Sequence, residues 1–200
     1  MSSNQFKFKV IIMGDSNAGK TSLVTRYVKG EFIDRPFPTI GESLYSKNLK
    51  IFGHDVLLKI YDTAGVEDYG GIQQFTIRES NAVIFAASYD STDSLANVNE
   101  VWWNTITNVI AENTFIPFLA ITKSDISASE KQITDTDIET VKRTHSLTSM
   151  CVSAKSGENV DVLFEEIAKQ LLSKSTPVPL DKNRVSLENP SINPKKSGCC

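Results

Sequence analysis

The segment "GDSNAGKT" (residues 14–21) decides the fold of this chain. It fits the pattern G-x-x-x-x-G-K-[ST], in which backbone N–H groups cradle the phosphates of a nucleotide. The apolar run "FKFKVIIM" (6–13) precedes it, and a helical pattern from about Thr21 to Lys29 follows. A strand, a glycine-rich turn and a helix in this order predict a phosphate-binding loop (P-loop). A chance glycine-rich turn is the alternative.

The loop residues have distinct expected roles. Lys20 reaches the terminal phosphates, and the Thr21 hydroxyl ligates Mg²⁺. Asn17 stands where glycine is common, but asparagine tolerates a positive φ better than most residues. The nucleotide-binding residues expected in this loop are Ser16, Asn17, Ala18, Gly19, Lys20, Thr21 and Ser22.

Strand-like and helical patterns alternate along the chain. Strands are expected at residues 6–13, 42–51, 55–62, 81–88, 115–122 and 146–153. Helices are expected at about 21–29, 94–112, 135–143 and 160–172, and Trp102 and Trp103 are expected to pack in the core. The alternation predicts an α/β fold: a mostly parallel six-stranded sheet flanked by about five helices. The tripeptide "FGH" (52–54) predicts a hairpin that adds one antiparallel edge strand.

The chain has 200 residues, 40% of them hydrophobic, which predicts one domain at residues 6–173 and a flexible basic tail at 174–200. Four of the seven prolines fall in that tail. The net charge of −3 argues against a nucleic-acid partner. No apolar run has the length of a membrane span, and lysines interrupt any signal-peptide core. We therefore expect a cytoplasmic protein.

Asp62 ends the strand-like run "VLLKIYD" (56–62). A carboxylate at this place can hold Mg²⁺ through water, while Gly65 offers its N–H to a γ-phosphate. An ordinary turn cap is the alternative, and the presence of the P-loop favours the metal role.

Two short segments follow later strands: "TKSD" (122–125) and "SAK" (153–155). The carboxylate of Asp125 can accept two hydrogen bonds from the ring N–H and the exocyclic amine of guanine. Adenine does not present that pair of donors, and a site built for it discriminates strongly. "TKSD" alone also fits a polar loop. The pair of segments argues against a P-loop kinase or ATPase.

The ordered motifs resemble the Ras superfamily of small GTPases over residues 6–173, which implies a P-loop NTPase G domain. They are "GDSNAGKTS" (14–22), "PTIG" (38–41), "DTAG" (62–65), "TKSD" (122–125) and "SAK" (153–155). The segments at 89–102 and 153–171 and the terminal "GCC" resemble the Rab branch in particular.

The resemblance implies further roles by position. Thr39 would bind Mg²⁺ and the γ-phosphate, Phe32 would pack on the guanine, and Lys123 would support the base. The backbone of Ala154 would contact the guanine carbonyl. The other implied residues of the base loops are Thr122, Ser153 and Lys155. Threonine at 122, where most Rab proteins have asparagine, is expected to weaken one loop-bracing hydrogen bond.

The resemblance also implies a function: a switch that cycles between GTP and GDP with Mg²⁺ and regulates vesicle trafficking. Its implied partners are effector proteins, an exchange factor, a GTPase-activating protein (GAP), a GDP-dissociation inhibitor and the prenylation machinery. The segment "IGESL" (40–44) departs from the Rab-like "IGVDF" pattern.

Val66 stands where the family carries its water-orienting glutamine. No catalytic residue is therefore assigned, and we expect weak intrinsic GTP hydrolysis. The second hypothesis is a nucleotide-locked GTP-binding module with negligible hydrolysis. A third possibility is that Gln73 or Gln74 reaches the water instead.

Cys199 and Cys200 end the chain behind the basic linker. This pair fits double geranylgeranylation, and two lipid chains give stable anchoring where one is marginal. We expect the prenylated protein at the cytosolic face of an endomembrane. An unmodified, solvated tail is the alternative.

Overall fold

The structure, a computed structural model, describes residues 5–34, 37, 39, 41–64 and 74–175. Several residues with predicted roles lie outside the described residues: Gly65, Val66, Gln73, Cys199 and Cys200.

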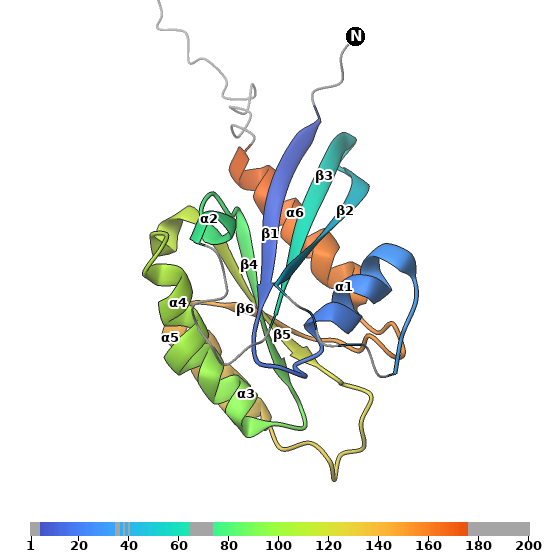
Figure 1. Cartoon of the computed structure of the whole chain (residues 1–200), viewed down its shortest axis with the longest axis vertical. Helices are drawn as coiled ribbons and strands as arrows, with labels where there is room; N and C mark the ends of the chain where they lie inside the picture. The colour runs from blue at the N-terminus through green and yellow to red at the C-terminus, as the bar shows by residue number, and fades with distance from the viewer. Residues whose placement is uncertain (1–4, 35–36, 38, 40, 65–73, 176–200) are drawn as a thin grey trace, which may run out of the picture.

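Six strands form one sheet, as the alternating patterns predicted (Figure 1). They are β1 (Phe6–Met13), β2 (Glu42–Ile51), β3 (His54–Thr63), β4 (Ala82–Ser88), β5 (Ile116–Thr122) and β6 (Thr148–Cys151). Their order is β2-β3-β1-β4-β5-β6, with β2 antiparallel to β3 and every other pair parallel. β4 is buried along its whole length because helices cover both faces of the sheet. The α/β prediction is confirmed.

The predicted hairpin joins β2 to β3 through two residues. Phe52 has φ 49° and Gly53 has φ 81°. Two consecutive positive φ angles define the turn whose twist matches that of paired antiparallel strands. The turn holds Ile51 opposite His54. In the strand order, β2 lies at one edge of the sheet.

Helices pack on both faces of the sheet (Figure 1). One face carries α1 (Lys20–Lys29) and α6 (Val160–Ser175), where Leu23 and Phe164 share one apolar cluster. The other face carries α3 (Thr92–Asn97), the π-helical turn η1 (Val98–Trp102), α4 (Trp103–Thr107) and α5 (Asp135–His145). Trp102 and Trp103 are buried in the second cluster, as predicted. The short α2 (Gln74–Ile77) and η2 (Glu112–Thr114) complete the described elements.

The helix expected at 94–112 differs from the prediction in its bounds and in its continuity. It begins earlier, at Thr92, because the Ser91 side chain accepts a hydrogen bond from the Ser94 N–H and caps it. It ends at Thr107. The Thr107 hydroxyl donates to the Trp103 carbonyl oxygen, and side-chain hydrogen bonds of this kind compete with the backbone hydrogen bonds of a helix. A π-helical turn interrupts it in the middle.

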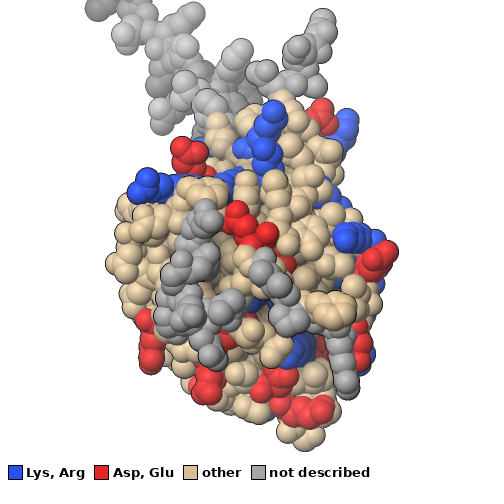
Figure 2. Space-filling model, in the orientation of Figure 1, with Lys and Arg blue, Asp and Glu red and all other residues tan. Residues whose placement is uncertain are grey.

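Charged side chains of both signs are interspersed on the face drawn in Figure 2. Within the described ranges, no helix combines the length and the apolar character needed to cross a bilayer.

Candidate functional site

A cavity of about 560 Å³ lies where β3 and β5 end and the P-loop leaves β1. This is the edge of an open α/β sheet at which ligands bind. The predicted residues that line it are Ser16, Asn17, Gly19, Lys20, Thr21, Ser22, Phe32, Thr39, Thr122, Lys123, Asp125, Ala154 and Lys155. Ala18 and Ser153 are buried and do not line it. The lining also includes five residues that the sequence motifs did not predict: Leu23, Asp34, Phe37, Thr63 and Ile126.

The P-loop has a backbone that only certain residues can adopt. Gly14 has φ 146°, and a Cβ atom there would lie 2.2 Å from the Ala86 carbonyl oxygen of β4. Any side chain at this position would push the loop off the sheet. Asn17 has φ 62°, so the expected positive φ is confirmed. Gly19, at φ 80°, turns the chain into α1.

Lys20 is buried, with 5% of its surface exposed. Its ammonium donates to the carbonyl oxygens of Gly14 and Asp15, both at 2.7 Å. Burial lowers the pKa of Lys20 to about 8, although the charges of Asp62 and Asp15 oppose that shift. A buried cation held by neutral carbonyls is stabilised when an anion enters the cavity.

Asp62 is completely buried at the end of β3. Neither carboxylate oxygen has a hydrogen-bond partner among the described residues; the Thr21 hydroxyl lies near but outside hydrogen-bond geometry. Burial raises the pKa of this carboxyl, while Thr21 and Lys20 lower it. The Thr21 and Thr39 hydroxyls lie 2.8 Å apart. An orphaned buried carboxylate beside two hydroxyl oxygens fits Mg²⁺, which takes oxygen ligands.

Asp125 faces the cavity and is held from behind. The Ser153 hydroxyl donates to Asp125 Oδ1 at 2.5 Å, and the Ser156 N–H donates to the Ser153 hydroxyl at 3.0 Å. Because Ser153 is fully buried, this chain of hydrogen bonds fixes the carboxylate against the cavity wall. The arrangement suits a fixed pair of N–H donors on a ligand.

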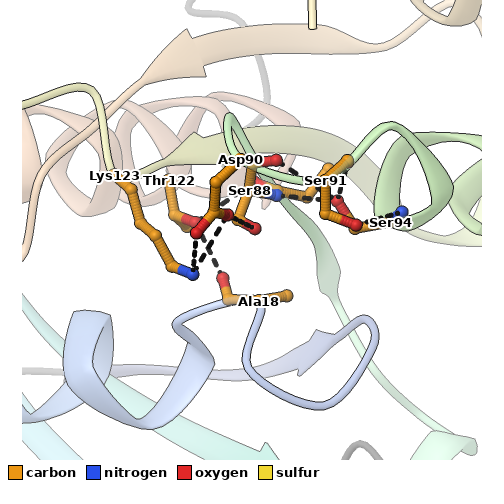
Figure 3. Close-up of polar contacts among 8 residues, drawn as sticks. Ala18, Ser88, Asp90, Ser91, Ser94, Thr122 and Lys123 are labelled. Atoms are coloured by element: carbon orange, nitrogen blue, oxygen red, sulfur yellow. Dashed lines mark hydrogen bonds and ion pairs between the residues drawn. The ribbon is translucent and has the colours of Figure 1, made fainter. Parts of the chain in front are cut away.

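Figure 3 shows how the last residue of β5, Thr122, and the next residue, Lys123, are braced. The Thr122 hydroxyl lies 2.8 Å from the Ala18 carbonyl oxygen of the P-loop and 3.2 Å from the Ala87 carbonyl oxygen. Threonine therefore keeps a brace between the two loops. The Lys123 ammonium pairs with Asp90 at 2.8 Å while its side chain lines the cavity.

Comparison with known proteins agrees with this geometry. The family model described as "Ras family" matches residues 9–173. The chain belongs to the Ras family.

Its relatives place it in the Rab branch of that family. It is 35% identical to the Ras-related protein Rab-26 of Rattus norvegicus over 86% of this chain and 66% of that protein. It is 30% identical to the Ras-related protein Rab5 of Nicotiana tabacum over 98% of this chain and 96% of that protein. The Ras-related protein Rab-24 of Dictyostelium discoideum is 30% identical over the whole of both chains.

Arg26 braces the base side of this Ras-family site from α1, a role that no sequence motif predicted. Its guanidinium donates to the carbonyl oxygens of Ala154 at 2.6 Å, Lys155 at 2.5 Å and Gly30 at 2.8 Å. It thus holds the backbone of the loop predicted to contact the guanine. No local motif links residues so far apart in the chain.

Gln74, one of the two glutamines considered as replacements for the residue at 66, begins α2. It is exposed and does not line the cavity.

Proposed function

We propose that the protein is a Rab-like small GTPase switch that binds GTP and GDP with Mg²⁺ and recruits effector proteins to a membrane. Its membership of the Ras family supports the guanine-nucleotide part of this proposal. The single observation that carries it is one cavity lined by the P-loop, Thr39 and Asp125. A phosphate-binding loop and a carboxylate that can select guanine thus line the same cavity.

The phosphates would lie against the P-loop and the start of α1. The ammonium of Lys20 already lies among the loop carbonyls and would gain charge-assisted hydrogen bonds to phosphate oxygens. The backbone N–H groups from Asn17 to Ser22 and the amino end of the helix favour the same anion.

Thr21, Thr39 and Asp62 would hold Mg²⁺, the first two through hydroxyl oxygens and Asp62 through water. The ion would neutralise charge on the β- and γ-phosphates. Binding would also place a cation beside the buried Asp62 carboxylate, which would offset the cost of burying its charge.

The guanine would lie between Phe32 and the base loops. Asp125 would accept from its ring N–H and its exocyclic amine, Lys123 would support the ring, and the Ala154 N–H would donate to its carbonyl oxygen. Ser153 orients Asp125, since the Ser153 hydroxyl donates to the Asp125 carboxylate. Adenine would leave this carboxylate unpaired, which disfavours its binding.

Hydrolysis is proposed to be slow. In this reaction the protein mainly positions the attacking water and stabilises charge. The Val66 side chain can neither donate nor accept a hydrogen bond, so it cannot orient that water, whereas Lys20 and the Gly65 N–H remain to bind the γ-phosphate. The valine at position 66 also supports the second candidate function, a nucleotide-locked module that keeps its GTP. A GAP of the type that supplies both an arginine and a glutamine in trans could restore turnover.

Single-turnover hydrolysis of GTP by the wild type and by Val66→Gln tests this proposal. We expect slow turnover in the wild type and a rise of about tenfold or more in the variant, because the glutamine restores a group that orients the water. Turnover below detection in the wild type alone would favour the nucleotide-locked module. Equal measurable rates would mean that position 66 does not control the attacking water.

Membrane attachment is proposed to depend on Cys199 and Cys200, modified by two prenyl groups. The proposed location is the cytosolic face of an endomembrane, with GDP-dissociation inhibitor and prenylation machinery as partners. Replacing both cysteines by serine should move the protein to the soluble fraction of cell lysates, since no lipid chain would then remain. Persistent membrane association of the double variant would contradict this.

A further inference from the structure

The helix after β4 contains one π-helical turn, Val98–Trp102. The N–H of Trp103 donates to the carbonyl oxygen of Val98, five residues earlier, in place of the four-residue spacing of an α-helix. Single π-helical turns are rare in proteins and are frequent at functional sites. This turn lies far from the ends of the helical segment, so it is not fraying.

The π-helical turn brings two side chains to one carboxylate. Asn97 Nδ2 donates to Asp15 Oδ2 at 2.8 Å, and Trp102 Nε1 donates to Asp15 Oδ1 at 2.7 Å. These donors are five residues apart. Five residues advance an α-helix by about 1.4 turns and separate the side chains, whereas the wider turn lets both face Asp15.

Asp15 is the second residue of the P-loop, yet it does not line the cavity. Its carboxylate binds the helix, while its carbonyl oxygen accepts from the Lys20 ammonium at 2.7 Å and from the Ala18 N–H at 3.2 Å. The same residue therefore connects the helix on one side with the phosphate-binding lysine on the other.

Trp102 is 3% exposed, and a buried indole N–H needs an acceptor. A carboxylate is a strong one, because hydrogen bonds to a charged group are shorter and stronger than neutral bonds. Trp102, Asn97 and Asp15 thus form a tether between helix and loop that uses no atom facing the nucleotide site.

We propose that this tether fixes the P-loop around Lys20 and slows the release of bound nucleotide, with Asn97 and Trp102 as positioning residues. The inference rests on the proposed nucleotide switch and concerns the regulation of that same site. A partner that bends the helix at the π-helical turn would loosen the P-loop without entering the cavity.

The test is the dissociation rate of radiolabelled GDP from the full chain, measured beside the thermal unfolding midpoint. Trp102→Phe keeps the ring packing and removes the N–H. The matched control is Trp103→Phe, the next residue, which is also buried but packs on Phe85, Phe115 and His145. Asn97→Ala removes the second donor. The site is half-buried and alanine is a good helix former, so the fold is retained. Trp102→Phe and Asn97→Ala are each also made in an Asp15→Ala background.

We expect Trp102→Phe and Asn97→Ala each to release GDP about tenfold faster, as expected for loss of a hydrogen bond to a charged group. Trp103→Phe should lower the unfolding midpoint and leave release unchanged. In the Asp15→Ala background neither substitution should add to the release rate, because the shared acceptor is gone.

Equal release from Trp102→Phe and Trp103→Phe would overturn the tether, as would undiminished effects in the Asp15→Ala background. A wild-type protein that retains no GDP would overturn the proposed function itself, and the two failures are thereby distinguished.

Discussion

The two halves of the cavity differ in how well their polar groups are satisfied. We define the phosphate half as the lining residues Lys20, Thr21 and Thr39 with the buried Asp62 beside them. The base half is defined as the lining residues Thr122, Lys123, Asp125 and Ala154 with the buried Ser153 behind Asp125. In the base half, hydrogen bonds and an ion pair hold each loop in place. In the phosphate half, a lysine and a carboxylate are buried without an ionic partner at salt-bridge distance among the described residues.

From this difference we expect the base half to determine selectivity between bases and the phosphate half to determine affinity. Hydrogen bonds within the protein fix the base half, so we expect it to discriminate between bases with little rearrangement. The phosphate half holds ionisable groups whose charged forms are destabilised by burial, and a phosphate with Mg²⁺ would satisfy both. Most of the binding free energy is therefore expected from the phosphate half.

The largest effect is expected from Lys20→Met. Loss of the charge-assisted bonds to phosphate should weaken GDP binding by about a hundredfold or more. The same change should leave unchanged, or raise, the unfolding midpoint of the nucleotide-free protein, because it removes a buried cation. Titration calorimetry and thermal unfolding measure the two quantities.

Lys29→Met is the matched control, because Lys29 is exposed in the last turn of the same helix. It should leave GDP affinity unchanged. A nucleotide-free Lys20→Met protein that is clearly less stable than the wild type would contradict the difference between the two halves.

A change of specificity is expected from Asp125→Asn in the base half. An amide presents one donor in place of one acceptor, so preference should move from guanine towards xanthine nucleotides. Competition of GDP and XDP for the variant measures this shift, expected to be about a hundredfold or more for a buried mispaired group. Unchanged preference for guanine would remove Asp125 from its role.

The sheet was predictable because its signals are local. The P-loop pattern lies between a strand and a helix, and "FGH" gives the hairpin turn directly. The parallel strands are short apolar runs bounded by polar turns, and their bounds differ from the prediction by only a few residues. The apolar pattern of a strand does not define its last hydrogen-bonded residue, because the neighbouring strand decides where pairing ends.

The supports of the site were not predictable from local patterns. Arg26 reaches Ala154, and Asp15 reaches Trp102, across long stretches of chain. Such contacts depend on how helices pack on the sheet, which one sequence does not state. The π-helical turn also escaped prediction, since apolar spacing near 3.6 continues on both sides of it.

The smallest effect is expected outside both halves, at His145. This imidazole stacks on Trp103 and its Nε2 lies 2.7 Å from Asn99 Oδ1, and burial lowers its pKa below 6.5. The unfolded chain then binds a proton at higher pH than the folded protein does. The free energy of unfolding should fall as pH drops below about 6.5, and His145→Gln should flatten that decline.

Denaturant unfolding between pH 7.5 and 5.5, roughly spanning the ordinary histidine pKa, measures this slope. The difference between wild type and variant should be the same with and without GDP, because His145 belongs to neither half. Identical slopes in the two proteins would show that His145 does not couple protonation to folding.

Competition between GDP and ADP for the wild-type protein tests the central claim most directly, with and without Mg²⁺. The protein, stripped of nucleotide, is loaded with a fluorescent GDP and titrated with each competitor. We predict displacement by GDP at stoichiometric amounts, displacement by ADP only at concentrations roughly a thousandfold higher, and faster release when Mg²⁺ is chelated. Equal displacement by the two nucleotides, or no retained GDP at all, would contradict the account of a guanine-nucleotide switch.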